Sequence, residues 1–436
     1  MNGDLKQFFK YIAPSMAGMV IVGTYSIVDT IFIGRAMGKL GLAAAAVTWP
    51  LVMLITAFGD MIGSGAAIIV SQSRGAGEPE RAQRAFGNMI VLLALTAAVF
   101  TAGVLPFLTP ILTAFRANAE LIDLAREYAT PLVAGSAAQM FGMGWMSVMR
   151  NDGHPVLAMW LVIIGLALNI LFDYIFIFPL GLGLRGAAIA TILSQVIVMV
   201  IGIIHYLSPQ TELRFTGFRL NRELCGRIFK NGIPTLGNQL SIIAMLFLHN
   251  WQSLRCGAVN GLAAYTLVAT IESMGSLLMT GLAAGVQPLV AFFYGAGKFR
   301  RMGRIGNYGY IAAFLIGVVL TVVSILGRDI FPDWFGLSGD VASLAGHGMV
   351  ISGFAFLLLG VIRVAGFYFQ STNKIGASSV LIYGDSFFAL PLCLFVLPVF
   401  WGMDGVWLAM PVSRVILFAM LCWFWFGGKK HGNRIA

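Results

Sequence analysis

Charged residues are scarce in this sequence, and their scarcity excludes a water-soluble protein. Only 11% of the 436 residues are Asp, Glu, Lys or Arg, and 58% are hydrophobic. A soluble domain carries about 25% charged residues. The mean hydropathy of +0.87 agrees with this comparison, so the composition predicts a polytopic membrane protein.

Several chemical signatures are missing as well. The four cysteines form no Cys-x-x-Cys motif and stand in different segments, which argues against a disulfide framework or a cysteine-based metal site. The sequence has no Walker motif for ATP and no HExxH, GxGD or His-acid motif of a membrane enzyme. The first apolar run lacks a small-residue cleavage site, so we expect no cleavable signal peptide. We therefore expect neither an enzymatic activity nor a bound cofactor, and any transport by this chain would be driven by an ion gradient or supplied by a partner.

Long apolar runs fill most of the chain. One spanning helix needs about 20 apolar residues, whereas a β-barrel would show alternating strands of about 10 residues. The runs predict twelve spanning helices near 11–33, 46–72, 86–108, 128–149, 157–179, 184–207, 228–252, 261–292, 306–326, 342–369, 376–399 and 402–426.

Basic residues gather on one side of these predicted spans. If both termini lie on that side, its loops and tails hold 19 Lys and Arg, the opposite loops hold 7, and Arg363 and Arg414 lie inside spans. Such a bias predicts cytoplasmic N and C termini, here in a bacterial inner membrane. It also accounts for the net charge of +10 without a nucleic-acid partner.

The first half of the sequence recurs in the second half at an offset of 220, which becomes 219 in the last span of each half. Gly41-Leu42-Ala43-Ala44 recurs at 261–264 and Gly75-Ala76-Gly77 at 295–297, and eleven of 44 aligned positions are identical without a gap. Internal repetition of this kind indicates a duplicated structural unit.

A polar segment at 208–227 separates the two repeats. We therefore expect an N-lobe at 1–207, a cytoplasmic linker at 208–227 and a C-lobe at 228–436. Because each lobe would hold six spans, the repeats would be parallel and related by a pseudo-two-fold axis along the membrane normal. A substrate cavity is then expected between the lobes.

Acidic residues inside spans need a partner, a proton or a function. Asp29 lies in span 1, and Asn169 and Asp173 lie four residues apart on one face of span 5. Thr191 lies in span 6, with Ala187 one turn before it. Together these residues could offer carboxylate, amide and hydroxyl oxygens to Na⁺ or hold an exchangeable proton. The alternative is a hydrogen-bond network that only joins helices.

Asp385 and Arg414 are expected at similar depth in spans 11 and 12. We interpret them as a structural ion pair that joins the two helices.

The remaining charged residues inside spans leave structure and function open. Glu272, in the outer half of span 8, could face the cavity and attract cations, and Asp60 is similarly placed. Met274 and Met279 could line a cavity suited to flat organic cations.

These residues resemble the multidrug and toxic compound extrusion (MATE) family over essentially the whole chain. The motifs that carry the resemblance are Val-Asp-Thr-Ile-Phe-Ile-Gly-Arg at 28–35, Ser-Gln-Ser-Arg-Gly-Ala-Gly at 71–77, Arg-Asn-Asp-Gly at 150–153, Asn-Ile-Leu-Phe-Asp at 169–173, Gln-Pro-Leu at 287–289 and Tyr-Gly-Ala-Gly at 294–297. The resemblance implies twelve helices in two bundles, and efflux of organic cationic drugs in exchange for Na⁺ or H⁺.

The resemblance also implies roles for single residues. Asp29, Asn169, Asp173, Ala187 and Thr191 match the N-lobe cation site of archaeal and DinF-like members. Span 7 contains no glutamate, which places the chain nearer the MepA-like branch. We expect the chain to act as a monomer in membrane lipid.

Two alternative functions would have different requirements. A flippase for a lipid-linked precursor, in the same wider superfamily, would need several cationic residues in its cavity, but only Arg363 and Arg414 lie inside spans. A receptor or channel would not require the internal repeat.

Overall fold

A computed structural model describes residues 3–115, 121–209, 211–216 and 218–430. These residues form helices and contain no β-strand. The side chains of residues 25–27 and 425–430 are also outside the description. Arg116 and Arg434, which contributed to the count of basic residues, lie outside the described residues.

Two compact units make up the chain. The first unit is Ala17–Leu236, and the second unit combines Met1–Met16 with Gly237–Ala436. The opening turns of the first helix thus pack with the second half of the sequence. The lobe boundaries expected at 1–207 and 228–436 stay a prediction.

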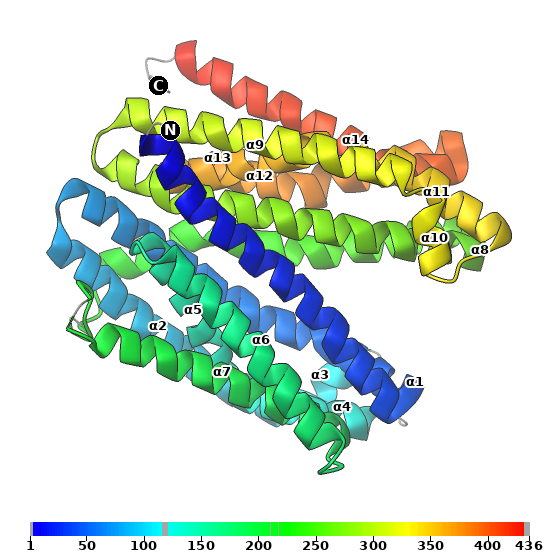
Figure 1. Ribbon diagram of the computed structural model, residues 1–436, viewed down its shortest axis with the longest axis horizontal. Coiled ribbons are helices and arrows are strands. Elements are labelled where there is room, and N and C mark those ends of the chain that lie inside the picture. The colour runs from blue at the N-terminus through cyan, green and yellow to red at the C-terminus, as the bar shows by residue number, and fades with distance from the viewer. Residues whose placement is uncertain (1–2, 116–120, 210, 217, 431–436) are drawn as a thin grey trace. The chain divides into compact units, whose positions relative to one another are not determined.

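The first half of the chain contains seven α-helices and a short 3₁₀ helix within its described residues. They are α1 (Gly3–Ala76), α2 (Pro79–Val104), η1 (Leu105–Phe107), α3 (Leu108–Ala114), α4 (Ile122–Ala134), α5 (Ser136–Asn151), α6 (Pro155–Ile177) and α7 (Gly183–Leu207). Helices α6 and α7 lie side by side over their length (Figure 1). Helices α6 and α7 correspond to the predicted spans 5 and 6, so this pairing positions the polar residues of both spans.

The second half contains seven α-helices and a short π-helix within its described residues. They are α8 (Arg222–Gly295), α9 (Phe299–Leu326), α10 (Ile330–Trp334), α11 (Gly339–Gly353), α12 (Phe356–Ser371), α13 (Ile375–Gly384), η2 (Asp385–Ala389) and α14 (Leu390–Lys430). Helices α9 and α12 pack together in this half.

The longest helices each hold more than one membrane crossing. Among the described residues, seven helices, or eight counting one bent pair, are long and apolar enough to cross a membrane. A helix of 74 residues, such as α1 or α8, would measure about 111 Å, far more than the roughly 30 Å of a bilayer core. The backbone leaves the helical conformation at Gly38 in α1, Ala258 in α8 and Gly402 in α14, and each break separates two crossings.

The remaining crossings follow from the other helices. Helices α4 and α5 meet at Gly135 and together make one crossing, and α11 with α12 makes another, bent by 46°. With α2, α6, α7 and α9 as single crossings, the described residues account for twelve. The predicted all-helical fold of twelve spans is confirmed.

The breaks in the long helices fall at corresponding positions of the sequence repeat. Gly38 has φ 59° and ψ −148°, and Ala258, which aligns with it in the second half, has φ 50° and ψ −146°. Gly402, the break in α14, has its counterpart at an offset of 219 in Gly183, the first residue of α7, and both have φ 52°. The two halves therefore reproduce one another in backbone conformation as well as in sequence.

The tight turns after the second span of each half also correspond. Gly77 and Gly297 adopt φ values of 74° and 66°, which a residue without a Cβ reaches at little cost. The amide of residue 78 donates to the carbonyl of residue 73 at 2.8 Å, and that of residue 298 to residue 293 at 2.9 Å. Both turns are glycine-terminated helix ends of the Schellman type.

Glycines of α1 approach the backbone of α5 closely in the first unit. A Cβ added to Gly59 would lie 2.7 Å from Cα of Met140, and one added to Gly63 would lie 2.7 Å from Cα of Gly144. Helices in lipid associate largely through such close approach of backbones. This packing fixes the second span of the first unit.

Candidate cation site

Helix α6 presents its polar residues on the face that packs inside the first unit. Its buried residues recur every three or four positions, as expected for one helical face, and the last include Asn169, Asp173 and Ile177. Asp173 is fully buried and Asn169 is 2% exposed. The sequence pattern therefore placed both side chains on the correct face.

Helix α7 supplies the neighbouring residues. Nδ2 of Asn169 donates a hydrogen bond to Oγ1 of Thr191 at 3.3 Å. Ala187, one turn earlier, is fully buried.

Asp29 of α1 completes the group. Its side chain is half-buried, and its charge acts on Asp173, so the two carboxyl groups lie within electrostatic reach of one another. No basic residue is among the described groups that act appreciably on either of them. The structure thus brings Asp29 and Asp173 together, with Asn169 and Thr191 hydrogen-bonded beside Asp173.

The oxygen atoms of this group have the chemistry of a cation site. Four buried acceptors have no hydrogen-bond partner within the described residues: Oδ1 of Asp29, Oδ1 of Asn169, and both carboxylate oxygens of Asp173. A buried carboxylate without a compensating partner is costly. A small hard cation prefers such oxygen ligands, and a proton on one carboxyl group would also remove the repulsion between two anions.

Asp60, the other acid of the first unit inside a span, has basic and polar neighbours. Oγ of Ser147 donates to Oδ1 of Asp60 at 3.3 Å, and Nη2 of Arg150 donates to the same hydroxyl at 3.4 Å. Arg150 also acts on Asp60 electrostatically. The sequence pattern places Arg150 in the loop after span 4, so it does not indicate this link.

A second charged group lies in the second unit. Arg414 forms an ion pair with Asp385 and is only 2% exposed. The charges of Arg414 and Arg363 both act on Glu272. Glu272 of span 8 therefore lies within electrostatic reach of Arg414, which pairs with Asp385.

Arg363 has further partners that the sequence did not indicate. It donates hydrogen bonds to Oδ1 of Asn238 and, at 3.1 Å, to Oγ of Ser276. Ser276 lies one turn after Glu272 on α8, so helical spacing alone could have indicated that these two residues share one face. These contacts give Arg363 polar surroundings inside its span.

The two methionines suggested for a cavity differ in exposure. Met274 is 36% exposed, whereas Met279 is fully buried, and a Cβ added to Gly360 would contact its side chain. Met279 thus packs in the interior of the second unit.

These observations define a helical membrane protein with twelve spans and acidic side chains inside the spans of both units. The MatE family model matches residues 14–175 and 234–395, two stretches related by the same offset as the internal repeat. The chain belongs to the MATE family. The family predicted from the motifs is confirmed.

Curated relatives extend over nearly the whole chain. The multidrug export protein MepA of Staphylococcus haemolyticus is 24% identical over 427 residues, covering 94% of this chain and 91% of the relative. MepA of Staphylococcus aureus is 25% identical over 438 residues, covering 95% and 92%. These relatives carry the name of the MepA-like branch, which the absence of a glutamate from span 7 indicated.

Solved structures share the fold. An outward-facing multidrug resistance MATE family transporter of the MOP superfamily superposes with a TM-score of 0.93 at 23% identity, covering 99% of this chain and 97% of the other. A MOP superfamily transporter from Pyrococcus furiosus, described as having a binding pocket of reverse polarity, gives 0.91 at 24% identity, with 98% and 96% covered.

Proposed function

We propose that this protein is a cation-coupled antiporter that exports organic cationic drugs and other toxic compounds across the bacterial inner membrane. The observation that carries the proposal is the set of buried acceptor oxygens on Asp29, Asn169 and Asp173 without partners among the described residues. Family membership and the export function named for the MepA relatives support the direction of transport.

The coupling ion would bind at the Asp29 and Asp173 carboxyl groups. An external Na⁺ or proton entering there neutralises part of their charge and changes the packing of the first unit's helices. Ion binding and drug binding must then weaken one another reciprocally, since exchange requires that they not be favoured together. The group offers carboxylate, amide and hydroxyl oxygens, and this combination favours Na⁺ over a proton as the coupling ion.

The second unit contributes differently to the proposal. Glu272 is acted on by Arg363 and Arg414, so its negative charge is balanced while both arginines stay within electrostatic reach. Attraction of a cationic drug by Glu272 would therefore depend on conformation. Exposed Met274 is a candidate contact for the apolar part of a drug.

A flippase for an anionic lipid precursor is the alternative. Both arginines inside the spans have acidic neighbours: Arg414 pairs with Asp385 and Arg363 interacts with Glu272. Neither offers an unbalanced positive charge to a pyrophosphate group, which favours the exporter of cations.

Ethidium efflux from pump-deficient bacteria tests the proposal. Cells expressing the wild type, Asp29→Asn or Asp173→Asn are loaded at low Na⁺ and pulsed with NaCl, or with acid at constant Na⁺. We expect NaCl to start efflux in the wild type and both variants to fall to the rate of cells without the transporter. Asp123→Asn is the matched control, because Asp123 is an exposed acid in the first turn of α4.

Each result has a separate meaning. Efflux started only by acid would keep the antiporter and change the ion to H⁺. Normal efflux by well-expressed Asp29→Asn and Asp173→Asn would refute the coupling site. No efflux of several cationic dyes by the wild type would refute drug export and favour the flippase.

A further inference from the structure

A cluster of possible metal ligands lies at one end of the first unit. Asp152 and His154 flank the turn between α5 and α6, and His205 lies in the last turns of α7. One ligand atom from each residue lies within 4.8 Å of the others. Nδ1 of His154 is 3.7 Å from Oδ2 of Asp152, and the two imidazole rings stand edge to face with centroids 5.2 Å apart.

The cluster combines a buried interior with an open side. The Asp152 side chain is 2% exposed and that of His154 is 45% exposed. Nε2 of His205 is buried and has no hydrogen-bond partner within the described part of the chain. A buried ring nitrogen without a partner is costly, and a bound metal would satisfy it.

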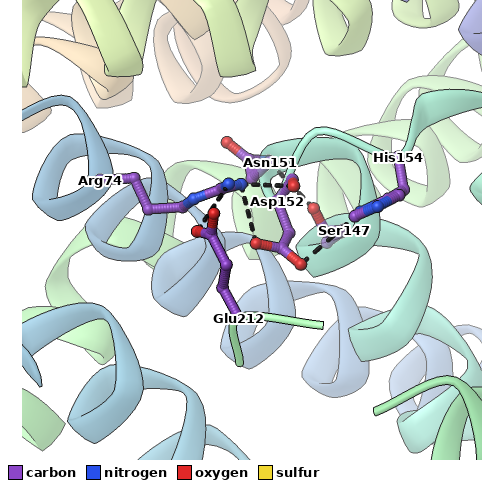
Figure 2. A network of polar contacts seen from close by, with 6 residues as sticks. All are labelled: Arg74, Ser147, Asn151, Asp152, His154 and Glu212. Atoms are coloured by element: carbon purple, nitrogen blue, oxygen red, sulfur yellow. Dashed lines mark hydrogen bonds and ion pairs between the residues drawn. The ribbon is translucent and has the colours of Figure 1, made fainter. Parts of the chain in front are cut away.

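Neighbouring charges hold the Asp152 carboxylate in place. Nη1 of Arg74 lies 2.8 Å from Oδ1 of Asp152 and donates to the Asp152 main-chain carbonyl. Nη2 of Arg74 lies 2.9 Å from Oε2 of Glu212. Figure 2 shows Arg74 between these two acids. Because Oδ1 of Asp152 pairs with Arg74, Oδ2 is the carboxylate oxygen that faces His154.

The charge balance of this cluster also suits a cation. Two carboxylates and one guanidinium leave a net negative charge when both histidines are neutral. Groups that orient a ligating carboxylate in this way are typical of metal sites.

We propose that Asp152, His154 and His205 form a zinc-binding site. Zinc takes imidazole nitrogens and carboxylate oxygens at about 2.0–2.1 Å in tetrahedral geometry, which places ligand atoms about 3.3 Å apart. The distance between Asp152 and His154 is close to this already, and the exposed His154 side chain can rotate to complete the approach. Water would occupy the fourth position.

The proposed zinc site is distinct from the candidate cation site and from the internal repeat. Asp173 follows His154 by 19 residues along α6, a distance of about 28 Å. The positions that correspond to the three ligands in the second half are Thr372, Lys374 and Phe424, none of which binds zinc in this way. The site therefore belongs to the first half alone, and it does not depend on the transport function.

Zinc binding to the whole purified chain in detergent tests the inference. The protein is prepared with an affinity tag free of histidine, stripped with a chelator, and titrated with Zn²⁺ against a chromophoric competitor. We expect one strong equivalent per chain in the wild type, and at least a roughly 10-fold loss of affinity in His154→Gln and in His205→Gln. His347→Gln is the matched control, since His347 also faces an acid, with Nε2 3.1 Å from Asp404.

Cobalt substitution and thermal unfolding give independent readouts. Co²⁺ should produce the visible bands of a tetrahedral site in the wild type and in His347→Gln, but not in the two ligand variants. Zn²⁺ should raise the unfolding temperature of the wild type and of His347→Gln but not of the ligand variants, while all metal-free variants unfold near the wild-type temperature. The proposal is overturned if the wild type binds no strong equivalent, or if His154→Gln and His205→Gln bind zinc as tightly as the wild type does.

Discussion

Replacing Ala258 with glycine is expected to stabilise the second unit. Ala258 breaks α8 with φ 50° and ψ −146°, a conformation that is essentially restricted to glycine. Its repeat counterpart Gly38 adopts nearly the same angles. The second half thus places a Cβ where the first half avoids one.

The size of the effect follows from two opposing terms. A non-glycine residue held in such a region costs about 1–3 kcal/mol, whereas glycine gives back about 0.4–1 kcal/mol by loosening the unfolded chain. The expected gain is the difference, about 1 kcal/mol. The reverse change, Gly38→Ala, should cost a similar amount, because a Cβ there meets no atom within 4 Å and only the backbone term changes.

Thermal unfolding in one detergent at one heating rate measures both changes. For a unit of this size, 1 kcal/mol corresponds to a shift of about 2–4 °C, upward for Ala258→Gly and downward for Gly38→Ala. An unchanged or lower unfolding temperature for Ala258→Gly, together with tolerance of Gly38→Ala, would show that these breaks carry no backbone strain.

Two further predictions concern packing within each unit. Asp385→Leu should destabilise the protein by about 3 kcal/mol because it leaves the buried Arg414 guanidinium without its ion pair, and adding Arg414→Met should recover most of the loss. Equal unfolding temperatures for the single and double variants would contradict this account. Gly63→Val should cost more than about 2 kcal/mol or prevent folding, because Gly144 stands where the new side chain would go. A normal size-exclusion profile and unfolding temperature for Gly63→Val would contradict the close contact of α1 with α5.

The spans and part of the candidate cation site could be predicted from local patterns. Apolar runs long enough to cross a bilayer indicated the crossings, and the spacing of Asn169 and Asp173 by about one turn placed them on one helical face. The predicted span boundaries bracket two of the three breaks, since Gly38 falls between 33 and 46 and Ala258 between 252 and 261. The exact residues of the breaks were not predictable, because prolines are the usual signal of a kink and the non-helical angles fall at Gly38, Ala258 and Gly402.

Contacts between distant segments needed the tertiary structure. Asp60 meets Ser147 across 87 positions, and Arg363 meets Asn238 across 125. The packing of the opening turns of α1 with the second half has no local signal either. Asp152 and His205 are likewise brought together only because α7 returns beside α5 and α6.

The amino-acid sequence alone is enough to establish a membrane protein of twelve helices in two repeats, and its motifs are enough to indicate the family. These properties follow from hydrophobicity, helical period and repetition, which are written in neighbouring residues or at a fixed offset. Only the folded chain shows which charged side chains meet, which polar atoms are left without partners among the described residues, and that Asp152, His154 and His205 come together. Those outcomes depend on helix packing, which sets the distances between residues far apart in the sequence.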